Sequence, residues 1–342
     1  MTEINLGSTQ DNYIVRQTNN IINVDDDFDG NLENAIAAAE DGDVVRLGAN
    51  VYDISGITIS KDITIDGISG SSIIDGGGTS GAILNLDRNA SGATLRDLEI
   101  TNGNIGISAN ETTDLTLARL EVHNIGLDET IRDGQNNIGI SLTSTDGFRL
   151  VNSEIRDIGR KGVGIIDTDG GTIRGVTVSN VNLEAEHAQS FDAAGIKLFN
   201  TNEVTVANNE LFQINAFNIW NDITSNTTIE GNVITGVGAD FLQPEFNFSV
   251  DVAGIYNEKS YESVVADNEV EAVENFTAFR ATEFTTESML LGRNNFSSVQ
   301  LNTEDFWANE EAERLVAVTE DPDAADFELF ADDFFAEANI GT

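Results

Sequence analysis

The chain has 342 residues and a formal net charge of −42, because 59 Asp and Glu residues oppose 17 Lys and Arg residues. This charge excludes direct binding of nucleic acid or of an anionic membrane, since both require a basic surface. The chain has no cysteine and only two histidines, His123 and His187, which excludes disulfides, thiolate chemistry and multi-histidine metal centres. Any metal would be a hard cation held by oxygen atoms, and we expect Ca²⁺ as the candidate cofactor.

The two ends of the chain predict where the protein works. The first twenty residues lack a basic region followed by an apolar stretch, so no Sec-type signal peptide is expected. No run of about 18 apolar residues occurs, which predicts no membrane-spanning helix. The acidic, aromatic segment 303–342 is interpreted as a C-terminal cap and tail that could carry a type I export signal. We therefore expect an extracellular or cell-surface protein, with a cytoplasmic location as the alternative.

Residues 1–43 form an N-terminal segment in which 31–40 has the Ala-rich amphipathic pattern of a short helix. Asp29 or Gly30 would begin this helix and Gly42 would end it, so that it covers the open edge of the structure that follows.

Two acidic segments are weak candidates for calcium ligands. Residues 25–30 have the alternating aspartates that begin a calcium loop, but Ile36 stands where such a loop needs glutamate. A calcium site and an acidic turn that caps the helix are both open interpretations there. Asp128, Glu129 and Asp133 form the second candidate.

One unit repeats through residues 44–302. Gly-Ile pairs recur at residues 106–107, 139–140, 164–165, 195–196 and 254–255, and Ile219 and Phe279 occupy the same place in two further repeats. Short strand patterns with alternating apolar residues follow each pair, and an Asn precedes the last of them. Three short strands in about 24 residues are too many for a βαβ unit. The pattern predicts an all-β, right-handed parallel β-helix of about 9–10 coils, with an inward apolar column and a ladder of stacked Asn side chains.

The entry into this repeat resembles a known superfamily. Residues 41–45 (DGDVV) and 48–52 (GANVY), which follow the expected helix, resemble the opening of the solenoid in pectate-lyase-like β-helix proteins. The resemblance covers about residues 24–300 and implies the fold. The superfamily includes lyases, hydrolases, epimerases and inert fibres, so the resemblance alone does not select an activity. Its usual reactions on uronic-acid polymers are β-elimination and C5 epimerisation.

Three longer repeats predict a site on one face of the solenoid. They place insertions at 124–137, 181–194 and 236–253, all just before the Gly-Ile strand, so loops should project over that strand. Alternation along this strand places outward side chains of successive coils in rows. One row contains the basic and aromatic residues Lys197, Trp220, Tyr256 and Arg280, in that order. The next row contains the carboxylates of Asp222 and Glu258. Such a face is typical of a carbohydrate groove, and an ordinary solvated strand face is the alternative.

The residue types predict roles in proton transfer next to a carboxylate. Lys197, Tyr256 and the loop residue His187 are the candidate catalytic base and acid. Trp220, Asp222, Glu258 and Arg280 are the candidate substrate-binding residues, with Arg280 holding a substrate carboxylate.

These roles predict an extracellular protein that acts on a polysaccharide partner, as a lyase or a C5-epimerase on a uronic-acid-containing glycan. Hydrolysis by the carboxylates of Asp222 and Glu258 is a less favoured form of the enzyme. A noncatalytic glycan-binding, adhesin or structural surface protein is the alternative. The oligomeric state is left open.

Overall fold

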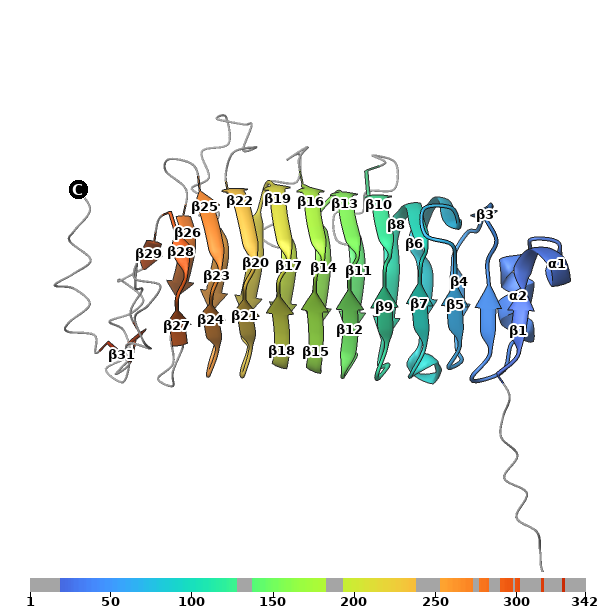
Figure 1. The fold of residues 1–342 in the computed structure, drawn as a ribbon, viewed down its shortest axis with the longest axis horizontal. Helices are drawn as coiled ribbons and strands as arrows, with labels where there is room; N and C mark the ends of the chain where they lie inside the picture. Colours follow the sequence, from blue (N-terminus) through green and yellow to red (C-terminus); the bar gives the residue numbers. More distant parts are fainter. Residues whose placement is uncertain are drawn as a thin grey trace, which may run out of the picture.

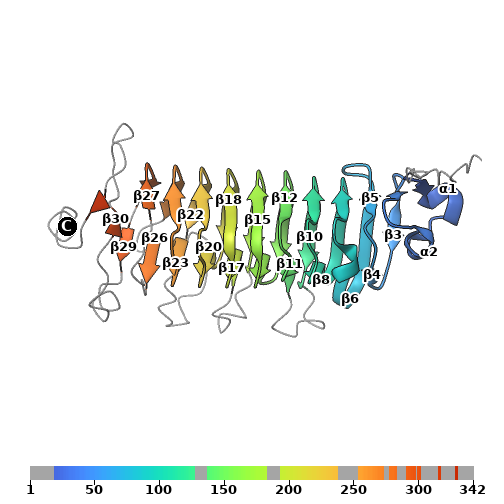
Figure 2. The same cartoon turned by 90° about the horizontal axis from the view of Figure 1, so that it is seen from below.

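The computed structural model of the chain describes residues 19–127, 137–182, 193–237, 253–272, 277–282, 290–297, 299–301, 315–316 and 328–329. Over these residues the chain winds into one long solenoid, with strands of successive coils side by side along its axis (Figures 1 and 2). Every pairing within the solenoid is parallel, and this confirms the single right-handed parallel β-helix predicted from the repeat.

The first sheet contains one short strand from each coil and runs from β1 at the N-terminal end to β27. Its strands, in spatial order, are β1 (Ile21–Asn23), β2 (Val44–Arg46), β5 (Thr64–Asp66), β7 (Thr94–Arg96), β9 (Thr116–Ala118), β12 (Phe148–Val151), β15 (Asp169–Arg174), β18 (Asn202–Ala207), β21 (Thr228–Glu230), β24 (Val264–Ala266) and β27 (Leu290–Gly292).

The second and third sheets share the long strands β6 (Ile73–Leu86) and β8 (Glu99–Asn110), which bend from one sheet into the other. The second sheet also contains β3 (Val51–Asp53), β10 (Glu121–Ile125), β13 (Glu154–Ile158), β16 (Thr177–Val181), β19 (Glu210–Ile214), β22 (Val233–Val237), β25 (Glu269–Ala272) and β28 (Asn295–Phe296). The third sheet contains β4 (Ile57–Ile59), β11 (Ile138–Thr143), β14 (Lys161–Ile166), β17 (Ala194–Phe199), β20 (Phe217–Asp222), β23 (Ala253–Glu258), β26 (Thr277–Thr282) and β29 (Val299–Leu301). A separate antiparallel pair joins β30 (Leu315–Val316) to β31 (Glu328–Leu329).

Inward side chains of the three sheets form one continuous apolar core. On the third sheet Ile140, Val163, Ile196 and Ile219 follow one another in register and are fully buried. Burial of each such side chain contributes about 1.5–3 kcal/mol, so the core column fixes the register of every coil.

The glycine of the recurring Gly-Ile pair faces the interior, where a side chain has no room. A Cβ on Gly139 would lie 2.6 Å from the carbonyl oxygen of Gly162, and one on Gly162 would lie 2.5 Å from that of Gly195. The glycine and the following apolar residue both point inward, so the outward row begins again one residue later. This close approach of neighbouring coils is the physical reason for the sequence marker.

The marker at residues 164–165 was assigned wrongly. Val163, not Ile165, pairs with Ile140 and with Ile196, so the glycine equivalent to Gly139 is Gly162. Gly164 instead pairs with Lys197 on the outward face. With this register the coils alternate regularly between long and short: successive core positions from Ile107 to Phe279 are separated by 33, 23, 33, 23, 36 and 24 residues.

Two helices cover the N-terminal end of the core: α1 (Val24–Phe28) and α2 (Leu32–Ala38). Helix α2 confirms the expected helix, but Asn31, not Asp29 or Gly30, caps it by accepting a hydrogen bond from the backbone N–H of Asn34 at 2.8 Å. The helix ends at Ala38, before Gly42, and the Lys61 ammonium donates to the carbonyl oxygens of residues 36, 37 and 39 at this end. A short 3₁₀ helix, Arg88–Ala90, lies beside the coils.

A buried asparagine ladder joins the last four described coils between the first and second sheets. Asn209 donates to Asn232 at 2.9 Å, Asn232 to Asn268 at 2.9 Å, and Asn268 to Asn294 at 3.0 Å, each through the side-chain amide. The ladder predicted from the repeated Asn is therefore confirmed, and its last described member is Asn294. Because each amide also donates to a backbone carbonyl, the buried polar groups are satisfied.

Among the described residues, none of the helices is long and apolar enough to cross a membrane. The insertions at 124–137, 181–194 and 236–253 and the segment 303–342 lie largely outside the described residues.

Two glycines on strand β14 provide a test of the inward and outward register. Gly162→Ala should lower the free energy of unfolding by about 1–3 kcal/mol, because its Cβ would overlap the neighbouring coil and lie 2.7 Å from Val178 Cγ1. Gly164→Ala, two residues away, should change it by no more than about 0.5 kcal/mol, because the nearest atom is 3.8 Å away. Equilibrium denaturation of both variants measures the difference, and equal losses would contradict the assigned register.

Candidate functional site

The candidate site is the outward face of the third sheet on strands β17, β20, β23 and β26. Lys197 pairs with Trp220, Trp220 with Tyr256, and Tyr256 with Arg280, each one coil further along the solenoid. The structure therefore brings these four residues into one row, in the order expected from strand alternation. Two residues further along each strand, Phe199, Asp222, Glu258 and Thr282 form the next row.

Three aromatic rings pack on one another in this face, outside the solenoid core. The Phe217 ring lies 4.9 Å from the Trp220 ring and 4.8 Å from the Tyr256 ring, centroid to centroid. Trp220 and Tyr256 are each 8% exposed and form an apolar cluster with Ala194 and Ala253 that is separate from the main core. A sugar ring would meet only the small exposed part of each ring, so the main effect of the cluster is to fix the polar groups around it.

Lys197 is held by contacts to a ring and to a carboxylate. Its Nζ lies 3.4 Å from the centroid of a Trp220 ring and 3.4 Å from Oδ2 of Asp222. A cation over the face of an indole is attracted by the ring quadrupole, and the attraction is stronger in a desolvated place. The Lys197 ammonium is therefore placed at a defined position on the face, with its side chain only 10% exposed.

Asp222 and Glu258 occupy neighbouring coils and share this environment. Burial raises the pKa of Asp222 above its ordinary 3.8, the Glu258 carboxylate raises it further, and Lys197 offsets only part of the rise. Glu258 accepts a hydrogen bond from the indole N–H of Trp220 at 3.1 Å and lies 3.9 Å from the Lys259 ammonium. The face thus contains the Asp222 carboxyl group, which retains its proton more strongly than usual, beside the Glu258 carboxylate, which is hydrogen-bonded to Trp220.

Arg280 ends the row on strand β26. Its guanidinium carbon lies 5.2 Å from the centroid of the Tyr256 ring. The planar guanidinium suits stacking on an aromatic ring and bidentate binding of a carboxylate. The row therefore has a cation at each end and two aromatic residues between them.

The sequence interpretation missed Phe217 and Lys161 on this face. Phe217 completes the aromatic cluster, and Lys161 lies 5% exposed on the coil before Lys197. The register places Gly164 and Ile166 in the outward rows of this coil. Gly164 was the signal for Lys161 in the sequence, because a glycine at an outward position leaves room for the long side chain of a neighbouring residue.

Other sequence-predicted residues have different outcomes. His187 lies outside the described residues, as do Asp128, Glu129 and Asp133. Asp25 lies in helix α1 and accepts a hydrogen bond from the Tyr52 hydroxyl at 2.9 Å. Across the part of the chain that the structure describes, no group of three or more His, Cys, Asp or Glu residues has an arrangement that could hold a metal ion. The calcium site stays a prediction.

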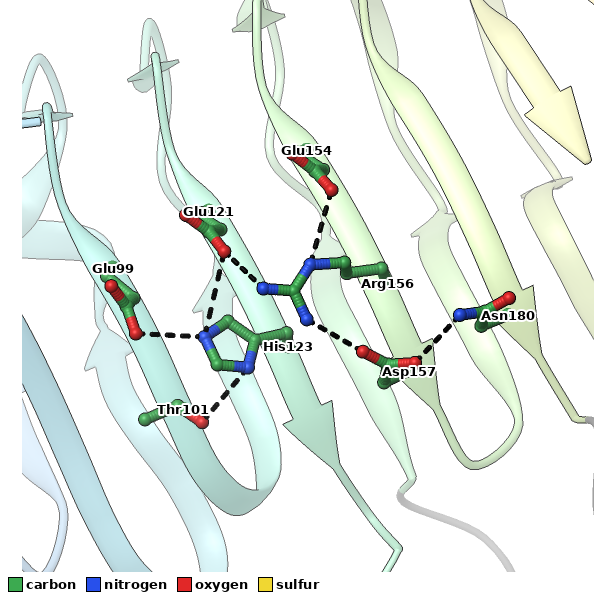
Figure 3. A network of polar contacts seen from close by, with 8 residues as sticks. All are labelled: Glu99, Thr101, Glu121, His123, Glu154, Arg156, Asp157 and Asn180. Atoms are coloured by element: carbon green, nitrogen blue, oxygen red, sulfur yellow. Dashed lines mark hydrogen bonds and ion pairs between the residues drawn. The ribbon is translucent and has the colours of Figure 1, made fainter. Parts of the chain in front are cut away.

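A second polar cluster lies on the outward face of the second sheet, across strands β8, β10, β13 and β16. Figure 3 shows Arg156 at its centre, with its guanidinium contacting Glu121, Glu154 at 3.2 Å and Asp157 at 2.7 Å. Burial lowers the pKa of Arg156, but hydrogen bonds to Asp157 and Glu121 outweigh it and raise the pKa above the ordinary value. The pair with Glu121 connects β13 to β10 of the adjacent coil, whereas Glu154 and Asp157 lie on the same strand as Arg156. The other members are Glu99, Thr101, His123 and Asn180, with His123 Nε2 3.0 Å from Glu99 and Nδ1 3.3 Å from Thr101.

Comparisons with known proteins agree on the fold. The family model for the right handed beta helix region matches residues 128–296. The solved Dettilon tailspike protein is similar at 12% identity and a TM-score of 0.51, covering 82% of this chain and 68% of that one. A GH87 α-1,3-glucanase catalytic domain in complex with nigerose is similar at 11% identity and a TM-score of 0.50, over 77% of this chain and 55% of that one. An alginate lyase from Paenibacillus sp. str. FPU-7 is similar at 16% identity and a TM-score of 0.49, over 79% of this chain and 94% of that one.

A search of curated protein sequences finds no match. The sheets, the register and the family model define a right-handed parallel β-helix protein with a polar and aromatic outward face. This is the fold that the opening of the repeat implied.

The electrostatic coupling of Asp222 to Lys197 can be measured. Lys197→Met should raise the pKa of Asp222 further, because it removes the main cation that lowers it. A carboxyl group whose pKa is raised in the folded state loses stability as the pH rises from 3.8 through that pKa, so the variant should extend this loss to higher pH. NMR titration of the Asp222 carboxyl resonance checks the shift.

Lys259→Met is the matched control, since Lys259 lowers the pKa of Asp222 less than Lys197 does. An Asp222 pKa that stays unchanged or falls in Lys197→Met would show that the ion pair seen in the structure does not form in solution.

Proposed function

We propose that the protein acts on a uronic-acid-containing glycan at the outward face of strands β17 to β26, as a lyase or a C5-epimerase. The observation that carries the proposal is the single row in which Lys197 and Arg280 flank Trp220 and Tyr256. The fold supports a glycan substrate in general terms, because solved structures that share it include an α-1,3-glucanase in complex with nigerose.

Both reactions begin when a base removes the proton next to the sugar carboxylate. A cation must then stabilise the negative charge that develops on that carboxylate. Arg280 has the geometry for this second role, since a guanidinium can bind a carboxylate through two hydrogen bonds. The described candidates for base and acid are Tyr256 and Lys197. Tyr256 is one coil from Arg280 along the row, and Lys197 is three coils from Arg280. His187 is the further candidate from the preceding insertion.

Asp222 and Glu258 favour a second enzymatic candidate. A glycoside hydrolase uses one carboxyl group with a raised pKa as the acid and a second, ionised one as base or nucleophile. The raised pKa of Asp222 beside Glu258 fits this division. Hydrolysis and elimination give different products, so one assay separates them.

We infer that the protein acts outside the cell, where acidic polysaccharides occur, and that Ca²⁺ could link an anionic glycan to an anionic protein. A noncatalytic glycan-binding protein would keep the same face and give binding without products. Activity in the presence and absence of a calcium chelator tests the cation separately from the residues.

A panel of polyuronates and neutral polysaccharides tests the proposal. Ultraviolet absorbance reports the unsaturated ends made by elimination, reducing ends without that absorbance report hydrolysis, and proton NMR of the recovered polymer reports epimerisation. Binding without change in any of the three signals would replace the enzyme with the noncatalytic alternative.

Variants of Lys197 separate its roles. Lys197→Met should lower turnover by about 10²–10⁴-fold, the usual contribution of a positioned acid or base. If Lys197 acts as the base, Lys197→Arg should be equally inactive, because arginine keeps its proton. Recovery of turnover in Lys197→Arg would assign Lys197 a purely electrostatic role, and unchanged turnover in both variants would remove it from the mechanism.

A further inference from the structure

The buried basic side chains of the described residues gather in two neighbouring coils. They are Arg160, Lys161 and Lys197, which are 6%, 5% and 8% exposed. Arg160 and Lys161 are adjacent in sequence at the start of strand β14, and β14 pairs directly with β17, which contains Lys197. Basic side chains on the first sheet are far more exposed: that of Arg46 is 48% exposed and that of Arg96 is 40% exposed.

The side chain of Lys161 runs toward the row that contains Lys197. A Cβ placed on Gly164 would lie 3.8 Å from Cδ of Lys161, so the Lys161 methylene groups pass over Gly164. Gly164 is the direct partner of Lys197 in the parallel register. Because glycine has no side chain, nothing on β14 separates Lys161 from Lys197 at this position.

Burial of three cations is costly unless anionic or polar groups meet them. All three cations already make further contacts in the structure. An anionic ligand would therefore bind beside these existing contacts or replace some of them. A protein with a net charge of −42 repels an acidic polymer at long range. Lys161 and Lys197, two cations on the same outward face, overcome this repulsion locally, within a Debye length of about 8 Å.

We propose that Lys161 and Lys197 form an anion subsite that binds an acidic substituent, a carboxylate or a sulfate, of the glycan. The proposal rests on the proposed function in that it takes a glycan as the ligand. The subsite lies at the N-terminal end of the aromatic cluster, and Arg280 lies at the other end, four coil steps from Lys161. Four steps of about 4.8 Å span roughly 19 Å. The ligand is therefore a linear glycan that lies along the solenoid axis and carries acidic groups on more than one sugar.

Calorimetric binding to the full chain tests the subsite. The ligands are a uronic-acid oligosaccharide, a sulfated oligosaccharide and a neutral oligosaccharide of the same length. Lys161→Gln should weaken binding of an acidic oligosaccharide by at least about tenfold, the effect of losing one charge-assisted hydrogen bond, and should weaken its dependence on salt. Lys161→Arg should retain most of the affinity. Whichever acidic ligand loses affinity in Lys161→Gln identifies the group as carboxylate or sulfate.

Arg46→Gln is the matched control, because it removes one positive charge from the first sheet and should leave binding unchanged. Unchanged affinity in Lys161→Gln, or an equal loss in Arg46→Gln, would overturn the proposal. If Lys161→Gln does not fold, the wild-type chain decides: binding of the acidic oligosaccharides that weakens with salt and exceeds binding of the neutral one supports the subsite, and equal binding of all three overturns it.

The outcomes separate this inference from the proposed function. Loss of acidic-ligand binding in Lys161→Gln, with no product formed by the wild type on any polymer, would keep the anion subsite and remove the enzyme. Turnover of a polyuronate by Lys161→Gln with wild-type affinity would keep the enzyme and remove the subsite.

Discussion

The parallel register between neighbouring coils is the constraint on which the rest of this structure depends. Inward apolar side chains on all three sheets hold the coils together, glycines permit close approach in several coils of the third sheet, and an asparagine ladder joins the last four described coils. A shift of one residue in any coil would turn its outward polar residues inward. The register therefore determines which residues of successive coils lie next to one another in the two outward rows.

The outward rows show how this scaffold arranges chemistry. The described residues of the site occupy adjacent strand positions, filled first by cations, then by aromatic residues, then by a cation. The aromatic rings pack on one another and so hold Lys197 and Arg280 at defined places. The same principle on the second sheet gives a different result, because carboxylates of two adjacent coils there surround Arg156.

The sequence predicted the fold well because the repeat reports directly on packing. Inward isoleucines and turn asparagines recur for physical reasons, so the coils, the asparagine ladder and the row from Lys197 to Arg280 could be derived by counting. The derivation failed at residues 162–165, where two glycines alternate with two apolar residues and either pair fits the marker. Only the pairing of Val163 with Ile140 distinguishes them. Lys161 was missed for the same reason, and the burial of Trp220 depends on Phe217, whose contribution local alternation does not reveal.

The alternation of long and short coils has a consequence for how such a chain can change over evolutionary time. Core positions two coils apart, Ile107 and Val163 or Val163 and Ile219, are separated by the same 56 residues. Duplication or deletion of one such 56-residue block would keep the alternation of long and short coils, so each remaining strand would still pair with a strand from the same kind of coil. The length of the solenoid can therefore vary by recombination in steps of two coils without any new packing having to arise.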